Sequence, residues 1–193
     1  MAKYNVGILL FPDVETLDFA GPFEVFSVAS ELNNFELFNV FTIGKNLEPI
    51  KTIHGLKVLP HHSLSNCPKV DILIIPGGFG TRQLVKDNEV MQWVQKNHQS
   101  TQLTLTVCTG AMVLGVLGML DDKEYTTHHL LFGEMANFAP KGILIKGKRF
   151  VKSGKIFTSA GISAGIDLSL HIVGELLGHK VAQKTARYME YGR

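Results

Sequence analysis

Three short, mainly apolar runs, each followed directly by a stretch with helical spacing, constrain the fold of this chain more than any other feature. The runs cover residues 6–11, 71–76 and 103–107. Each is rich in Val, Ile or Leu and is short, so each predicts a strand that is covered on both faces. Strands that alternate with helices are typical of an α/β sandwich with a mostly parallel central sheet.

The rest of the chain continues this alternation. Helical spacing predicts helices over 17–31, 81–98, 109–119, 128–137, 164–177 and 181–191. Extended pieces are predicted over 35–43, 56–60, 126–127, 143–145, 149–151 and 156–158. We find no internal repeat, linker or low-complexity tract, so residues 1–193 are expected to form a single domain.

Composition and charge argue against a nucleic-acid partner. The chain has 193 residues, of which 45% are hydrophobic and 19% charged, and these values suit a compact domain with a sizeable core. The formal net charge is only +2. Basic residues are scattered, and the one small cluster, KGKR at 146–149, is interpreted as a hairpin turn. We therefore expect no nucleic-acid binding.

The expected compartment is the cytoplasm. No stretch reaches the roughly 18 continuous apolar residues of a membrane helix, so we expect no membrane partner. The apolar start of the chain lacks a small-residue cleavage site and is interpreted as a first strand. Cys67 and Cys108 are too few for a disulfide framework. A reducing compartment is the natural setting for such a chain.

Three segments with chemical potential each follow a predicted strand. They are the loop up to Asp18, the glycine-rich GGFG at 77–80, and Cys108. In parallel sheets, ligands bind beyond the carboxyl ends of the strands. We therefore expect these three segments to meet at one edge of the sheet.

Cys108 lies where a strand gives way to a helix. The helix dipole and the unpaired N–H groups of a first turn favour thiolate over thiol. Gly110 would let the backbone turn close without a clash, as in other nucleophile elbows. The alternative is a packed, unreactive thiol, which is the interpretation we give to Cys67.

The neighbours of Cys108 offer partners for it. Gly77 and Gly78 could bring backbone N–H groups to a ligand and, with the Thr109 N–H, form an oxyanion-type hole. A tight turn before a helix explains the two glycines equally simply. Asp18 could act as a general acid or base, or it could only cap its helix. Glu15 is a competitor that spacing alone does not exclude.

The histidines carry a weaker signal. His61 and His62 precede a predicted loop and are interpreted as surface residues. His128 and His129 follow two threonines, and each is more readily structural than catalytic on sequence grounds. The segment HHSLSNC at 61–67 lacks the ligand spacing of a tetrahedral zinc site, so no metal is expected.

The chain resembles the ThiJ/PfpI superfamily over nearly its whole length. The resemblance rests on the motifs GILLFPDVETLDFAGPFEVF, DILIIPGGFG, TVCTGAMVLG, TTHHLL and SAGISAGIDLSLHIVGELLG. It implies a flavodoxin-like, class I glutamine amidotransferase-like fold with three layers. Within the superfamily the chain is most similar to isocyanide hydratases and to the amidotransferase-like domains of some transcription regulators.

The resemblance also implies catalytic roles. Cys108 matches the nucleophile, and Asp18, rather than Glu15, matches the acidic residue beside it. Thr109 matches the residue that follows the nucleophile in isocyanide hydratases. Protease-like relatives have a histidine at that position, and true glutamine amidotransferases have a late His-x-Glu that this sequence lacks.

Other positions match the backbone and accessory parts of such sites. Gly78 and Thr109 match positions whose N–H groups face the reacting centre, and Gly77 lies beside them. His128 matches the histidine of the TTH motif, as an accessory residue. The DNA-binding domain of the related regulators is not found before Arg193.

These matches imply a cysteine-dependent lyase that hydrates a small electrophilic substrate, an isocyanide, to an N-substituted formamide. No cofactor is expected, and members of the superfamily commonly form homodimers. Two alternatives remain open: a glyoxalase-like enzyme acting on 2-oxoaldehydes, and a redox-sensing or protective protein that uses Cys108 without turnover.

Overall fold

A seven-stranded sheet forms the centre of the molecule. The structure, a computed structural model, describes residues 3–192, so residues 1, 2 and 193 of the predicted domain lie outside it. The strand order is β10-β11-β7-β6-β1-β2-β5, and every neighbouring pair is parallel except β10 with β11. The strands are β1 (Tyr4–Leu9), β2 (Phe38–Gly44), β5 (His62–Ser63), β6 (Ile72–Ile75), β7 (Leu103–Thr106), β10 (Phe150–Ser153) and β11 (Ile156–Ser159). The predicted, mostly parallel sheet is confirmed.

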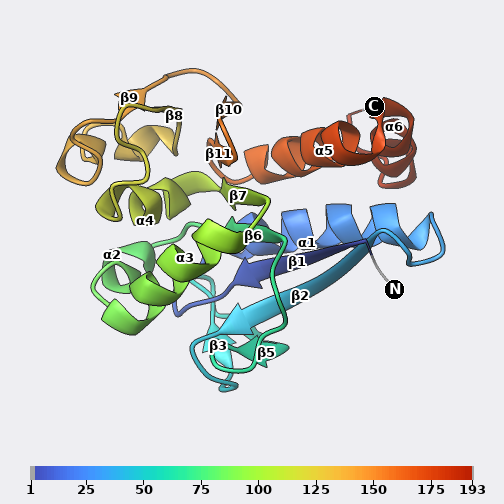
Figure 1. The fold of residues 1–193 in the computed structure, drawn as a ribbon, viewed down its shortest axis with the longest axis horizontal. Helices are drawn as coiled ribbons and strands as arrows, with labels where there is room; N and C mark the ends of the chain where they lie inside the picture. The colour runs from blue at the N-terminus through green and yellow to red at the C-terminus, as the bar shows by residue number, and fades with distance from the viewer. Residues whose placement is uncertain (1–2, 193) are drawn as a thin grey trace.

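Helices cover both faces of this sheet. They are α1 (Thr16–Glu31), α2 (Thr81–Leu84), α3 (Asn88–Ser100), α4 (Ala111–Val116), α5 (Ala164–Leu177) and α6 (His179–Tyr188). Figure 1 shows α5 and α6 beside α1, whereas α2, α3 and α4 lie together in a separate group. The predicted three-layer α/β sandwich is therefore confirmed. Within residues 3–192, no helix combines the length and the apolar character that crossing a bilayer requires.

The central strands are buried because helices pack on both of their faces. All four residues of β6 are 0% exposed, and Val6 and Ile8 of β1 are equally buried. Each such aliphatic side chain contributes about 1.5–3 kcal/mol relative to its exposed state. The core thus fixes β1, β6 and β7 side by side, and their carboxyl ends point to the same edge.

The helix predicted over 81–98 is interrupted. The structure has the single turn α2, a short connection, and then α3. Asp87 leaves the helical conformation and accepts hydrogen bonds from the N–H groups of Glu89 and Val90, at 3.2 and 3.3 Å. An aspartate that caps the helix following it competes with helix continuation, and this cap starts α3 anew.

Replacing Asp87 by alanine is expected to lower the free energy of unfolding by about 1 kcal/mol, because two N–H groups of α3 lose their acceptor. Urea denaturation measures this change. Glu89→Ala is the matched control. Like Asp87→Ala it removes an exposed ion pair to Lys45, but it leaves the Asp87 cap in place. That variant should change stability by less than about 0.5 kcal/mol. Equal losses in both variants would contradict the capping role.

The helix predicted over 128–137 is wrong. The segment forms two separate 3₁₀ turns, His129–Leu131 and Met135–Asn137. Gly133 lies between them, and glycine in a helix interior is unfavourable by about 1 kcal/mol relative to alanine. The side chain of His128 also accepts a hydrogen bond from the Leu130 N–H, which starts a turn rather than a long helix.

Three peripheral predictions are also corrected. In the predicted strand 56–60, only β4 (Lys57–Val58) is extended, and it pairs with β3 (Ile50–Lys51) outside the main sheet. The strand that pairs with β2 at this edge is β5, so His62 lies in the sheet and is half-buried, whereas His61 is exposed as predicted. The cluster at 146–149 is not a hairpin turn, because the strand before it, β9 (Ile143–Leu144), pairs with β8 (Glu124–Tyr125). It connects two different sheets.

Candidate active site

Cys108 occupies a strained turn between β7 and α4. It opens the 3₁₀ turn Cys108–Gly110, and its φ of 57° lies in the left-handed region. A residue with a side chain adopts this conformation at a cost of about 1–3 kcal/mol, which the surrounding structure must offset. Gly110 makes the turn possible, since a Cβ there would lie 2.2 Å from the carbonyl oxygen of Ile75. The predicted elbow is present.

Two hydrogen bonds hold the backbone of Cys108 in this conformation. Its N–H donates to the carbonyl oxygen of Ala160, at 3.2 Å. Its own carbonyl oxygen accepts a hydrogen bond from the buried Thr127 hydroxyl, at 2.7 Å. Both partners come from segments that follow the elbow in the chain, so the residue after β11 and the segment before His128 together fix the Cys108 backbone.

Thr127→Val is expected to lower the free energy of unfolding by about 1–3 kcal/mol, because a buried carbonyl oxygen loses its donor. Thr126→Val is the control, because it makes the same Thr-to-Val replacement one residue away. The Thr126 hydroxyl is buried and has no hydrogen-bond partner among the described residues, so its removal should be neutral or stabilising. Urea denaturation of both variants measures the difference. A loss at Thr126 that matches the loss at Thr127 would contradict this assignment.

Asp18 lies beside the thiol and is fully buried. Its carboxyl group interacts with the Cys108 side chain, and Oδ2 accepts a hydrogen bond from the Gly77 N–H at 3.0 Å. Asp18 therefore does not cap α1; the residue before that helix is Glu15, which makes no side-chain cap. Glu15 instead approaches His54, with 3.6 Å between Oε1 and Nδ1. Of the two candidate acids, the structure brings Asp18 to Cys108.

Burial favours the protonated forms of the Asp18 carboxyl and the Cys108 thiol. Burial raises the pKa of Asp18 to about 7, and the nearby negative charge of Glu15 adds to this effect, while the Gly77 N–H opposes it. Burial and the charge of Asp18 also raise the pKa of the Cys108 thiol. Near neutral pH the Asp18 carboxyl is therefore partly protonated, while the Cys108 side chain stays a thiol.

This outcome differs from the predicted activation by a helix terminus. The N–H groups of Thr109 and Ile162 do face the thiol and favour the thiolate, as expected for such donors. Burial and the neighbouring carboxylate outweigh them. Near neutral pH the structure therefore favours the Cys108 thiol over the thiolate that the helix terminus led us to expect.

Thr109 and the two glycines form a hydrogen-bonded unit. The Gly78 N–H donates to Thr109 Oγ1 at 2.9 Å, and the Thr109 hydroxyl donates back to the Gly78 carbonyl oxygen at 3.1 Å. Thr81 adds a hydroxyl donor to the same carbonyl, at 2.9 Å. The Gly78 N–H, expected to face the reacting centre, is thus engaged by Thr109, and the Gly77 N–H by Asp18.

Gly77 has no room for a side chain. A Cβ there would lie 2.5 Å from the Thr109 nitrogen and 2.8 Å from Oδ2 of Asp18. Gly78 has a φ of +128°, which favours glycine. Both glycines are needed to bring the acid, the thiol and Thr109 together.

His128 lies nearby but forms no hydrogen bond with Cys108 in the described part of the chain. It is half-buried and stacks on His129, with 4.4 Å between the ring centroids. Burial and the neighbouring His129 lower the pKa of His128, while Glu15 partly opposes this shift. Its ring is therefore neutral at physiological pH.

A cavity of about 430 Å³ opens next to the thiol. Three of its lining residues contact Cys108: Thr127, Ala160 and Ile162. The complete lining is Leu17, Thr127, His128, His129, Gly147, Lys148, Arg149, Ala160, Gly161, Ile162 and Ser163. Cys108 itself is 6% exposed and does not line the cavity, so these three residues are what join the cavity to the thiol.

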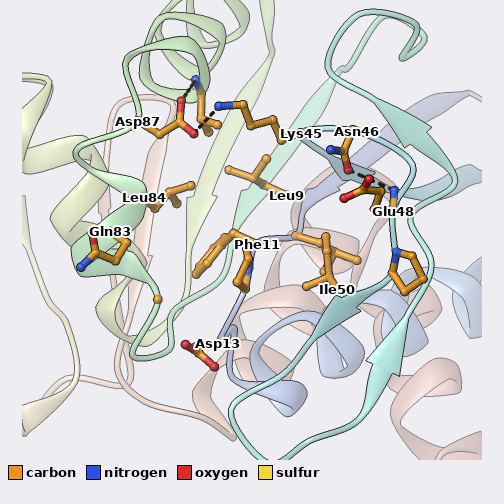
Figure 2. Close-up of a pocket in the computed structure, with 15 residues that line it drawn as sticks. Leu9, Phe11, Asp13, Lys45, Asn46, Glu48, Ile50, Gln83, Leu84 and Asp87 are labelled. Atoms are coloured by element: carbon orange, nitrogen blue, oxygen red, sulfur yellow. Dashed lines mark hydrogen bonds and ion pairs between the residues drawn. The ribbon is translucent and has the colours of Figure 1, made fainter.

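A second cavity, of about 360 Å³, lies beyond the carboxyl ends of β1 and β2. Figure 2 shows Leu9, Phe11, Leu84 and Ile50 around it, with Lys45 reaching toward Asp87 along one side. Neither cysteine lines either cavity. Three residues that contact Cys108 line the cavity beside Thr127 and none lines this second one, so the cavity beside Thr127 is the candidate substrate site.

Sequence reasoning missed several residues that shape the site. Thr127, Ala160 and Ile162 hold the elbow or face the thiol, and Thr81 steadies Gly78. The only signal was their place within the motifs TTHHLL, SAGISAG and the segment after GGFG. Among residues 3–192, no group of three or more His, Cys, Asp or Glu side chains is placed to hold a metal ion.

Comparison with known proteins gives consistent matches. The sequence model of the DJ-1/PfpI family matches residues 4–175. Isonitrile hydratase of Pseudomonas putida is 32% identical over 187 residues, which cover 97% of this chain and 78% of that protein. A ThiJ/PfpI family protein from Pseudomonas syringae has a crystal structure with a TM-score of 0.89 and 25% identity, covering 100% of this chain and 77% of that one.

More distant relatives have other functions. Glutathione-independent glyoxalase DJR-1.2 of Caenorhabditis elegans is 27% identical over 141 residues, which cover 72% of this chain and 74% of that protein. The HTH-type transcriptional regulator GbdR of Pseudomonas aeruginosa is 26% identical over 189 residues. That match covers 98% of this chain but only 51% of the regulator, so the chain spans about half of that relative.

Proposed function

This chain belongs to the DJ-1/PfpI family, and on that basis we propose that it is a cysteine-dependent enzyme that hydrates an isocyanide to an N-substituted formamide. The observation that carries the proposal is the pairing of the strained Cys108 with the buried Asp18, next to a cavity lined by three residues that contact Cys108. The similarity to isonitrile hydratase indicates which electrophile such a pair would attack.

In the proposed reaction, the Cys108 thiol first passes its proton to the Asp18 carboxylate, and the resulting thiolate then attacks. The sulfur forms a bond to the terminal isocyanide carbon, and Asp18 delivers its proton to that same carbon. The product of this step is a thioimidate in which carbon is bonded to sulfur, hydrogen and nitrogen. Nucleophilic catalysis thus uses one acid–base residue.

Water completes the cycle. Asp18, now a carboxylate, takes a proton from water while the water oxygen bonds to the thioimidate carbon, and the proton passes to nitrogen. The carbon–sulfur bond then breaks, the hydroxyl proton returns to Asp18, and the thiolate leaves. The sum is isocyanide plus water giving the formamide, so no external oxidant or reductant is required.

The direct test is product analysis. Purified protein is incubated with cyclohexyl isocyanide, and N-cyclohexylformamide is measured by chromatography and mass spectrometry. We expect formamide in proportion to enzyme concentration. Water labelled with ¹⁸O should place one label in the formamide oxygen. Absence of formamide with a folded protein would overturn the proposal.

A glyoxalase-like reaction on 2-oxoaldehydes is the second candidate, because the similarity to DJR-1.2 extends over most of this chain. Formation of lactate from methylglyoxal, with none of the formamide, would favour it. A redox-sensing role through Cys108 is the third candidate, and reversible sulfenic acid at Cys108 with no substrate consumed would favour it.

The proposal includes a homodimer in the cytoplasm. Leu17 and Ile162 are more than one-third exposed beside the cavity, and a second copy of the chain would cover such apolar side chains. Both cysteines are free thiols, which suits a reducing compartment. Light scattering coupled to size exclusion should give twice the mass of one chain. A monomer at micromolar concentration would contradict the dimer.

A further inference from the structure

The cavity beside Cys108 has a basic entrance. Four of its lining residues carry basic side chains, and we call Lys148, Arg149, His128 and His129 the basic rim. No carboxylate is among the described residues that line the cavity. This composition is unusual for a chain whose formal net charge is only +2.

Lys148 and Arg149 supply the permanent charge. Lys148 is exposed and forms no ion pair within residues 3–192. Arg149 is held in place by Asp167, through Nε at 2.6 Å and through Nη2. Nη2 also donates to the Ser163 hydroxyl at 3.2 Å, which leaves the hydrogen of that hydroxyl free to donate to a ligand.

His128 adds a neutral donor. Its Nδ1 accepts the Leu130 N–H at 3.2 Å, so in the neutral ring the proton lies on Nε2. The ring packs against Gly161, where a Cβ would lie 1.9 Å from Cδ2. Gly161 therefore leaves room for the His128 ring at the cavity wall, where the Nε2–H of the ring can donate to a ligand.

The acids nearest the rim offset part of this charge. Asp167 pairs with Arg149, so Lys148 is the permanently charged rim residue that has no ion-pair partner within residues 3–192. Glu15 approaches His54, and its charge also acts on His128. Asp18 is fully buried and does not line the cavity. Leu17 and Ile162 add apolar walls to the cavity.

We propose that the substrate of Cys108 carries a carboxylate, separated from its electrophilic end by an apolar spacer, and that Lys148 and Arg149 bind that carboxylate. The identity of the electrophilic group rests on the proposed function. The expectation that the substrate also carries an anionic group rests on the cavity alone. An ω-isocyano carboxylic acid would place its isocyano carbon at the thiol and its carboxylate at the basic rim.

Alkylation tests the charge independently of turnover. Iodoacetate and iodoacetamide transfer similar groups to a thiolate with loss of iodide, but only iodoacetate is an anion. With limiting reagent and peptide mapping, the rate ratio of iodoacetate to iodoacetamide at Cys108 is divided by the same ratio at Cys67. Because each ratio refers to a single thiol, its thiolate fraction cancels.

We expect this normalised ratio to exceed one by about three- to tenfold at low ionic strength and to fall toward one in 0.5 M NaCl. Lys148→Gln should lower it at least twofold. Lys146→Gln, the same charge change two residues away and outside the cavity lining, should leave it unaltered. A ratio near one in the wild type, or equal values in both variants, would overturn the proposal.

Turnover then separates this inference from the proposed function. An ω-isocyano acid, 5-isocyanopentanoate, is compared with its methyl ester by measuring kcat/KM for each compound in the wild type and in Lys148→Gln. We expect the acid to be preferred at least fivefold, and the preference to shrink in the variant. Turnover of the ester with no preference for the acid rejects the carboxylate site and keeps the hydratase. Turnover of neither compound rejects the hydratase, and the alkylation ratio still decides the anion site.

Discussion

Replacing Cys108 by alanine is expected to lower kcat/KM for isocyanide hydration by at least about 10³-fold, which corresponds to roughly 4 kcal/mol of transition-state stabilisation. Without the sulfur no thioimidate forms, and Asp18 would have to activate water for direct attack on the free isocyanide carbon. Initial rates of formamide production at subsaturating substrate measure the loss.

Controls for this variant come from the chain itself. Cys67→Ala removes the other thiol, which is half-buried and lines neither cavity, and should keep at least half of the activity. Alanine at position 108 keeps the same positive φ, so unfolding by urea should show that the fold survives. If a folded Cys108→Ala protein retained hydratase activity, the covalent mechanism would be wrong.

Replacing Asp18 by asparagine is expected to have two effects of opposite sign. Activity should fall by about 10²- to 10⁴-fold, because asparagine can neither deliver nor accept the proton. Stability at pH 8 should rise, because the variant no longer buries a carboxylate. Such an exchange of stability for function is common at active sites.

The sign of the stability change follows from the pKa of Asp18. Its value rises from 3.8 to about 7 on folding, so between these values the native state binds more protons than the unfolded state. Wild-type stability therefore decreases as pH rises through this window, by on the order of 4 kcal/mol for an isolated group. Asparagine removes this dependence, so the two unfolding curves should converge near pH 4 and separate at pH 8.

Glu15→Gln is the matched control for Asp18→Asn. Glu15 raises the pKa of Asp18 through its charge but does not contact the thiol. Its replacement should keep the proton donor and shift the acidic limb of the kcat/KM profile to lower pH. A loss of activity as deep as that of Asp18→Asn, at every pH, would assign the acid–base role to the wrong carboxylate.

The sequence predicted the parts of the fold that strong local patterns encode. Short apolar runs identified β1, β6 and β7, and the same runs placed Cys108 and the glycine pair just after strands and Asp18 in the helix that follows β1. Periodicity was less informative at the periphery. The cap at Asp87 and the glycine at position 133 each ended a helix that spacing alone would have continued.

The chemistry of the thiol was the least predictable part. A helix terminus suggested a low pKa, but burial and the charge of Asp18 act in the other direction, and burial is a property of the whole fold. Likewise, the side chain of Thr109 takes up the Gly78 N–H. Such competition for a donor depends on distances that no spacing in the sequence reports.

The partners of the Cys108 backbone have a consequence for the growing chain. Residues 127 and 160 leave the ribosome well after residue 108, so the nascent cysteine has neither hydrogen bond that holds its left-handed conformation. Asp18 becomes its neighbour only when β1, β6 and β7 are assembled. During synthesis the thiol is therefore an ordinary flexible cysteine, and it acquires its acid partner and its cavity only when the last strands of the sheet are in place.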